Sequence, residues 1–161
     1  MGEDTQHVVA GSIGSPIDDP ESTMAGLAPG PLPSGTGLTV LVVDDDAVIR
    51  ALVARTLTLA HFDVATAPTG KDALRLVAEG RVMPVILVTD IEMPEMNGVE
   101  LAARLLALRP TLRVVMMTGD ADRAESARHH PSIVDSVLLK PFALADLVRV
   151  VTDAGDQTRT R

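Results

Sequence analysis

Short runs of β-branched and apolar residues alternate along this chain with longer segments in which apolar residues recur every three or four positions. The short runs predict five strands, at residues 39–43, 62–67, 85–90, 112–117 and 134–139. The segments between and after them predict five helices. Four of these have an apolar face, whereas the one at about residues 121–130 is polar and has little apolar surface. Because strands and helices alternate with short loops, the pattern indicates an α/β fold in which helices cover both faces of a parallel sheet.

Polar residues mark where three of the helices begin. Asp46 precedes the first helix as a capping carboxylate, Thr69 and Asp72 resemble a capping box before the second, and Asn97 with Glu100 can cap the third. The helices are therefore expected to start soon after the strands end.

Residues 1–37 differ from the rest of the chain. They hold five of the eleven prolines and seven of the twelve glycines, and all five of their charged residues are acidic. Such a segment cannot bury enough apolar surface to order itself, so we expect a disordered tail. Residues 38–154 form the predicted domain, and we expect residues 155–161 to be a frayed C-terminus.

The composition narrows the classes of partner. The formal net charge is -8 and aromatic residues make up 1% of the chain, which disfavours phosphate backbones, anionic membranes and stacked nucleobases as partners. The chain has no cysteine, so disulfides and thiolate metal sites are excluded. No apolar run is long enough to span a membrane. We therefore expect a cytoplasmic protein that binds neither nucleic acid nor membrane.

Polar side chains stand where the predicted strands end. Asp44 and Asp45 follow the first strand and Asp90 ends the third, while Thr118 and Lys140 follow the fourth and fifth. In a sheet of order 2-1-3-4-5 the first and third strands are neighbours, so three carboxylates crowd into the crevice beyond the strands' carboxyl ends. Like charges this close need compensation, and oxygen ligands suit Mg²⁺. The sequence therefore predicts a magnesium site in this crevice.

Lys140 adds a cation to the same crevice. It is one of two lysines in a chain with twelve arginines. A compact ammonium suits holding a single phosphoryl oxygen as a point charge, whereas the planar arginine fork does not. The residues at the strand ends thus suggest a site for phosphoryl chemistry.

Together these positions resemble the receiver domain of bacterial two-component response regulators, over residues 38–153. The resemblance is carried by Val42-Val43-Asp44-Asp45, Asp90-Ile91-Glu92-Met93-Pro94 with Asn97-Gly98, Met117-Thr118-Gly119 and Lys140-Pro141-Phe142. It implies a flavodoxin-like, doubly wound five-stranded parallel sheet of order 2-1-3-4-5 with five helices on both faces. It also implies a phosphorylation switch, in which a histidine kinase or histidine phosphotransfer protein donates the phosphoryl group and an unidentified downstream protein responds.

The resemblance implies a role for each polar residue that binds the phosphoryl group. Asp90 would be the phosphoacceptor, a nucleophile that forms an acyl phosphate. Thr118 and Lys140 would each hold a phosphoryl oxygen, and the pull on Thr118 would reposition the loop that follows it. The peptide bond between Lys140 and Pro141 is expected to be cis.

The resemblance also implies the ligands of the magnesium ion. Asp45 and Asp90 would bind it directly, Asp44 through a water molecule and Glu92 through its backbone carbonyl. The ion would offset repulsion between the attacking carboxylate and the incoming phosphoryl oxygens. On this interpretation the protein is not an enzyme with an outside substrate, and it catalyses only its own phosphoryl transfer and dephosphorylation.

Two features depart from the usual pattern of the family. Val137 lies three positions before Lys140, where the family often has an aromatic residue that turns inward on activation. Glu92 and Asp120, two positions after the phosphoacceptor and after the threonine, are both acidic. In the family these positions influence how fast the acyl phosphate hydrolyses, so we expect both side chains to alter its lifetime, in a direction that the sequence does not determine.

Several alternatives stay open. Only about twenty residues follow Lys140, so we expect a stand-alone, chemotaxis-regulator-like receiver, although a fragment of a larger hybrid kinase or regulator would look the same. A haloacid-dehalogenase-type phosphohydrolase would use Asp44 and Asp46, but it needs a further acidic pair downstream and leaves Asp90 without a role. A degenerate receiver that only binds partners is the third alternative, and the intact acidic set argues against it.

Overall fold

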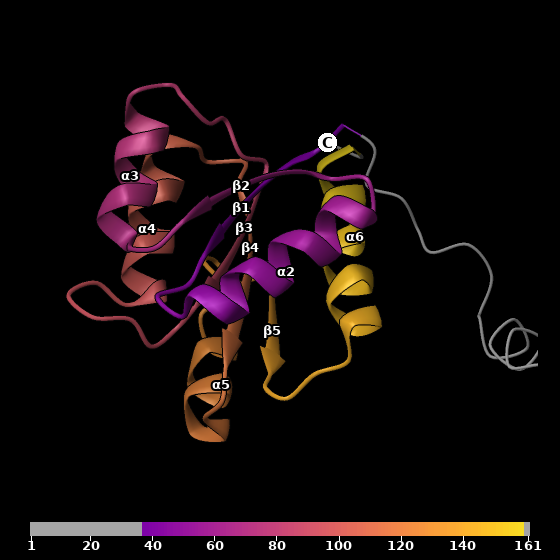
Figure 1. Ribbon diagram of the computed structural model, residues 1–161. Coiled ribbons are helices and arrows are strands. Elements are labelled where there is room, and N and C mark those ends of the chain that lie inside the picture. The colour runs from indigo at the N-terminus through magenta and orange to yellow at the C-terminus, as the bar shows by residue number, and fades with distance from the viewer. Residues whose placement is uncertain (1–36, 160–161) are drawn as a thin grey trace, which may run out of the picture. The chain divides into compact units, whose positions relative to one another are not determined.

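The structure is a computed structural model, and it describes residues 37–159. Within this range five parallel strands form one sheet in the order β2-β1-β3-β4-β5, and helices lie on both of its faces (Figure 1). The predicted α/β class, strand order and doubly wound arrangement are confirmed. The predicted disordered tail lies, except for its last residue, outside the described residues.

The strands are short, and the central ones are buried. Their bounds are β1 (Thr39–Val43), β2 (Asp63–Ala67), β3 (Ile86–Asp90), β4 (Arg113–Thr118) and β5 (Ser136–Leu139). Every residue of β3 is buried, as expected for a strand with neighbours on both sides and helices on both faces. Val43 of β1 pairs with Ala67 of β2 and with Thr89 of β3. These strands therefore end at one edge of the sheet, and the residues that follow them lie close together.

Five helices cover the sheet within residues 37–159. Their bounds are α2 (Ala47–Leu59), α3 (Gly70–Ala78), α4 (Gly98–Leu108), α5 (Ala121–Arg128) and α6 (Leu144–Arg159). On one face the core includes Val53 and Leu57 of α2 with Leu147 and Val151 of α6, and on the other it includes Ala73, Leu101, Leu105 and Ala127 of α3, α4 and α5. Figure 1 shows α2 and α6 on one side of the strands and α3 and α4 on the other. No helix in this range is long and apolar enough to cross a membrane.

Side-chain caps begin the helices where the sequence predicts them. Asp46, Thr69 and Asn97 each accept a hydrogen bond from a backbone N–H group in the first turn of α2, α3 and α4. Asp120 caps α5 in the same way, which the sequence analysis did not identify. Each of these four helices therefore has a fixed starting point close to the edge of the sheet at which the strands end.

The last helix is longer than the sequence indicates. Residues 155–159 were expected to be frayed, but α6 continues to Arg159. Gly155 is buried, and a Cβ atom there would lie 2.6 Å from Leu38 Cδ1, so the helix packs closely against the residue that precedes β1. The side chain of Arg113 also donates a hydrogen bond to the Gln157 carbonyl. These contacts come from residues distant in the sequence, and the polar local pattern gives no sign of them.

Candidate functional site

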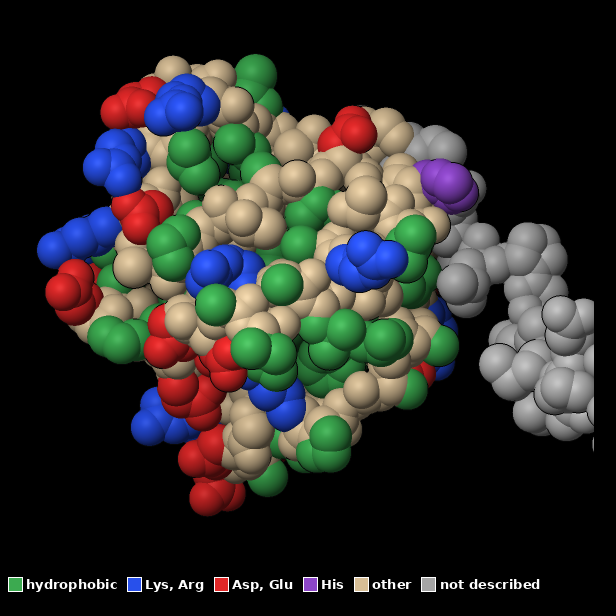
Figure 2. All heavy atoms as spheres, in the orientation of Figure 1, with side chains coloured by type: hydrophobic (Ala, Val, Ile, Leu, Met, Phe, Trp, Pro, Cys, Tyr) green, Lys and Arg blue, Asp and Glu red, His purple; other side chains and the backbone are tan. Residues whose placement is uncertain are grey.

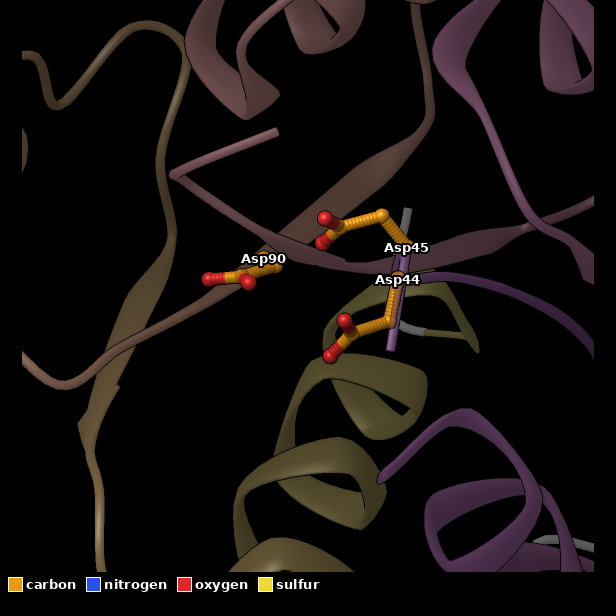
Figure 3. A group of neighbouring side chains, drawn as sticks. All are labelled: Asp44, Asp45 and Asp90. Atoms are coloured by element: carbon orange, nitrogen blue, oxygen red, sulfur yellow. The ribbon is translucent and has the colours of Figure 1, made fainter. Parts of the chain in front are cut away.

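The sheet brings three carboxylates together. Asp44 and Asp45 follow β1, and Asp90 is the last residue of the neighbouring strand β3. One carboxylate oxygen from each lies within 4.8 Å of the others, and Figure 3 shows the three side chains projecting from adjacent strand ends. The convergence follows from the register, because Val43 and Thr89 are paired and the residues after them emerge side by side.

Two of these carboxylates are buried with unsatisfied oxygens. Asp44 is fully buried and Asp90 is 8% exposed. Asp44 Oδ1 accepts a hydrogen bond from Asp46 N at 2.9 Å, but Asp44 Oδ2 and Asp90 Oδ1 have no hydrogen-bond partner. Buried carboxylate oxygens are normally satisfied. The two oxygens are therefore available to a ligand that supplies positive charge or hydrogen-bond donors.

The site raises the pKa of its two buried carboxyl groups, Asp44 and Asp90. Burial, which disfavours the charged form, is the main cause that raises the pKa of Asp90 to about 6, and the charges of Asp44 and Glu92 add to it while Lys140 opposes it. Burial also raises the pKa of Asp44 above its ordinary value, with Lys140 and a backbone hydrogen bond opposing. The charged carboxylates are thus held at a cost in free energy, which a cation would relieve.

Lys140 provides one positive charge between the two buried carboxylates. Its Nζ atom lies 3.6 Å from Asp44 Oδ2 and 3.6 Å from Asp90 Oδ2. Its backbone N–H donates to the Thr118 carbonyl at 2.7 Å, and the peptide bond to Pro141 is cis, as expected. The cluster has three carboxylates, and this one ammonium lies beside two of them, which leaves an excess of negative charge.

The acidic cluster fits a divalent cation. The donor set of Asp44, Asp45 and Asp90 consists only of oxygen atoms, two carboxylate oxygens in it lack partners, and Asp45 is exposed, so water can complete the coordination. Such a set matches the preference of Mg²⁺, which binds few protein oxygens and keeps several waters. Glu92 is predicted to bind through its backbone carbonyl. Its side chain accepts a hydrogen bond from Thr118 and also lies close enough to Asp90 to raise the pKa of that carboxyl group.

Thr118 lies at the end of β4 and takes part in a second network. Its side chain is fully buried, its Oγ1 donates to Glu92 Oε1 at 2.7 Å, and it accepts from Asp120 N at 3.0 Å. Arg123 of α5 places Nε 3.6 Å from Glu92 Oε1 and 3.6 Å from Asp120 Oδ2. The sequence analysis did not identify Arg123, because nothing local to α5 indicates that it faces the loop after β3.

Gly98 packs against the backbone of Asp90. A Cβ atom at this position would lie 2.2 Å from the Asp90 carbonyl oxygen, and Gly98 N donates to the Ile91 carbonyl at 2.9 Å. The start of α4 therefore packs directly on the backbone of the residue that ends β3. Only glycine allows this approach, so Gly98 helps to fix where Asp90 stands.

An apolar hollow adjoins Lys140. It has a volume of about 350 Å³ and is lined by Ile49, Leu52 and Val53 of α2 and by Lys140, Pro141, Phe142 and Leu144. Figure 2 shows apolar side chains gathered on this face of the molecule. The hollow and the acidic cluster share Lys140, so a partner bound in the hollow would lie next to the carboxylates.

Comparison with known proteins gives consistent matches. A family model described as response regulator receiver domain matches residues 40–152. The transcriptional regulatory protein PrrA of Mycobacterium tuberculosis is 39% identical over 116 residues, which cover 70% of this chain and 49% of that protein. The DNA-binding transcriptional regulator NtrC of Azospirillum brasilense is 33% identical over 116 residues, covering 72% of this chain and 24% of that protein. This chain therefore spans half the length of these relatives or less.

A solved structure gives the same result. The CheY-like response regulator receiver domain protein of Methanospirillum hungatei matches with a TM-score of 0.69 and 26% identity, covering 76% of this chain and 97% of that one. The similarity thus extends over nearly all of that protein.

Proposed function

Because this chain belongs to the family of response regulator receiver domains, we propose that it is a phosphorylation switch that carries a phosphoryl group on Asp90. The surroundings of Asp90 support this most directly. The side chain is buried, Oδ1 has no partner and Oδ2 faces an ammonium at 3.6 Å. A carboxylate that only capped a turn would have its oxygens satisfied by backbone N–H groups.

The proposed reaction is a phosphoryl transfer to a carboxylate. An oxygen of ionised Asp90 attacks the phosphorus atom of the donor, and the bond from phosphorus to the donor's leaving atom breaks. The electron pair of that bond leaves with the donor, and Asp90 becomes an acyl phosphate. In the second half of the cycle water attacks the phosphorus atom and the bond from phosphorus to the Asp90 oxygen breaks, which releases inorganic phosphate and restores the carboxylate. We propose that this cycle is the only chemistry that the domain catalyses.

The surrounding residues bind and orient the phosphoryl group. Lys140 already lies between Asp44 and Asp90, so its ammonium can turn to a phosphoryl oxygen without moving the backbone. The Thr118 hydroxyl would donate to a second oxygen. Asp44, Asp45 and Asp90 would hold Mg²⁺, with the Glu92 carbonyl as a further ligand. When bound, the ion would supply positive charge that offsets repulsion between Asp90 and the phosphoryl oxygens.

We propose that the phosphoryl donor is a histidine kinase or a histidine phosphotransfer protein, which docks over the apolar hollow. Val48 and Leu52 of α2 are 74% and 45% exposed, and exposed apolar side chains in a cluster are typical of binding surfaces. The output is proposed to be contact with a downstream protein. One relative is named as DNA-binding, so the expectation that this chain binds no nucleic acid stays a prediction, as does its cytoplasmic location.

A phosphohydrolase mechanism on Asp44 has less support. That scheme needs Asp46 as the second acidic group, but Asp46 Oδ1 accepts from Val48 N at 2.9 Å as the cap of α2. Asp44 Oδ1 is held by Asp46 N. Asp46 thus already caps α2, whereas Asp90 would have no role in the phosphohydrolase mechanism.

The experiment is to incubate the full chain with Mg²⁺ and acetyl phosphate and to record its intact mass. The proposal predicts a gain of one phosphoryl group that requires Mg²⁺, is removed by hydroxylamine as expected for an acyl phosphate, and is absent in Asp90→Ala. A phosphohydrolase would instead release phosphate continuously and lose activity in Asp44→Ala. A domain that only binds partners would give no adduct, and either result would overturn the proposal.

A further inference from the structure

We propose that Glu92 and Arg123 form a latch that holds the Thr118 hydroxyl away from Asp90 until a phosphoryl group displaces Glu92. The latch consists of these three side chains, which come from the loop after β3, from α5 and from the end of β4. Glu92 and Arg123 are positioning residues in this scheme, because they act on the phosphoryl group through Thr118. The inference deepens the proposed function and rests on it.

The first step of the argument is that the single proton of the Thr118 hydroxyl is already used. A hydroxyl group has one proton to donate, and here that proton goes to Glu92 Oε1 at 2.7 Å. The oxygen accepts from Asp120 N at 3.0 Å. Thr118 is fully buried, so water cannot replace either partner. A phosphoryl oxygen can therefore receive the Thr118 proton only if Glu92 gives it up.

The second step is that Arg123 favours the closed arrangement. Its Nε lies 3.6 Å from carboxylate oxygens of both Glu92 and Asp120. Without a cation between them these two carboxylates would repel each other. Arg123 therefore helps to keep Glu92 over Thr118, although its side chain is 57% exposed and each ion pair is correspondingly weak.

The third step is that the latch can open without disturbing the core. The Glu92 side chain is 36% exposed, so it can turn outward into water. Once phosphorylated, Asp90 carries near the end of β4 a phosphoryl group whose three oxygens share a charge of about −2 and accept hydrogen bonds strongly. In this exchange a phosphoryl oxygen replaces the Glu92 carboxylate as the acceptor of the Thr118 hydroxyl proton. Thr118 thereby becomes available only when the competing anion has arrived.

A ground-state test needs neither metal nor phosphoryl donor. The Thr118 methyl resonance, assigned by comparison with Thr118→Val, is recorded by NMR for the parent and for Glu92→Asp, Glu92→Gln and Arg123→Gln. Glu92→Asp keeps the charge but shortens the reach, and Glu92→Gln keeps the shape but removes the charge. The latch predicts that all three variants shift this resonance. Arg104→Gln breaks a similar exposed ion pair, with Glu100 on α4, and is expected to leave it unchanged.

The second measurement is the affinity for beryllofluoride with Mg²⁺, which mimics the phosphoryl group on Asp90. If Glu92 competes for the Thr118 proton, Glu92→Asp and Glu92→Gln should each raise the affinity about three- to tenfold, within the range for a charge-assisted hydrogen bond. Arg123→Gln should raise it about twofold and have no effect in the Glu92→Gln background. In the Thr118→Val background neither Glu92 variant should change the affinity.

The outcomes separate this inference from the proposed function. If Glu92→Gln raises the affinity but Glu92→Asp does not, or if the gain persists in Thr118→Val, Glu92 acts only through its charge and the latch is refuted. An unchanged Thr118 resonance in both Glu92 variants refutes it as well. If beryllofluoride binds to no variant while the resonance shifts as expected, the latch exists in the resting state and the proposed phosphorylation of Asp90 is what fails.

Discussion

Replacing Asp90 by asparagine should stabilise the metal-free protein, even though it removes the residue on which the function depends. The substitution keeps the shape of the side chain and removes its charge. Burial raises the pKa of Asp90 from 3.8 to about 6, so the charged form is less favourable in the folded state than in the unfolded chain. At neutral pH the parent carries this cost and the variant does not.

The size and pH dependence of the effect follow from the two pKa values. Each pKa unit corresponds to about 1.4 kcal/mol, so the difference between 3.8 and about 6 amounts to about 3 kcal/mol at pH ~7.5. Because the folded pKa is the higher one, the parent loses stability as the pH rises from about 4 through about 6. The advantage of Asp90→Asn should therefore shrink to about 1 kcal/mol at pH ~4.5.

The assay is urea unfolding, followed by circular dichroism in the presence of a chelator at both pH values. Asp153→Asn, at an exposed position of α6, is the matched control and should change the free energy of unfolding by less than about 0.5 kcal/mol at either pH. Equal stability of Asp90→Asn and the parent at neutral pH would refute the reasoning. So would an advantage of the variant that stays the same at both pH values.

Three further predictions follow from the site. Gly98→Ala should lower the free energy of unfolding in urea by about 2–4 kcal/mol, because its Cβ atom would overlap the Asp90 carbonyl. Gly119→Ala, with open space around the Cβ atom, should not show this steric cost. Similar losses in both variants would contradict the packing argument. Mg²⁺ at about 100 times its Kd should stabilise the parent by about 2.7 kcal/mol. Asp45→Asn should lose most of this gain at the same Mg²⁺ concentration. An equal gain in the variant and the parent would place the ion elsewhere. Lys140→Met should slow phosphorylation by acetyl phosphate about tenfold or more. It removes the only cation within 3.6 Å of the Asp44 and Asp90 carboxylates among the described residues. A rate within about twofold of the parent would exclude a role of Lys140 in the transfer.

The sequence predicts the fold well because its signals are local. The buried run that ends at Asp90, the caps at Asp46 and Asn97 and the alternation of elements each reflect a few neighbouring residues. The strand order then places the carboxylates after β1 and β3 together, and the structure has them within 4.8 Å of one another. What the motifs imply for each residue's role stays a prediction.

Features that depend on distant contacts could not be predicted in this way. The contact from Arg123 to Glu92 joins α5 to the loop after β3, and nothing in the polar sequence of α5 indicates it. The close approach of Gly98 to Asp90 depends on how α4 docks. Residues 155–161 were expected to fray because they lie at a terminus, but α6 continues to Arg159 and Gly155 packs against Leu38.

The most direct test of the central claim is to locate the phosphoryl group in the chain. After reaction with Mg²⁺ and acetyl phosphate, borohydride reduces an aspartyl phosphate to homoserine, and peptide mass spectrometry then identifies the modified position. The account predicts homoserine at Asp90 and at no other aspartate. Homoserine at Asp44, or an unmodified chain under conditions in which the protein is folded and Mg²⁺ is bound, would contradict it.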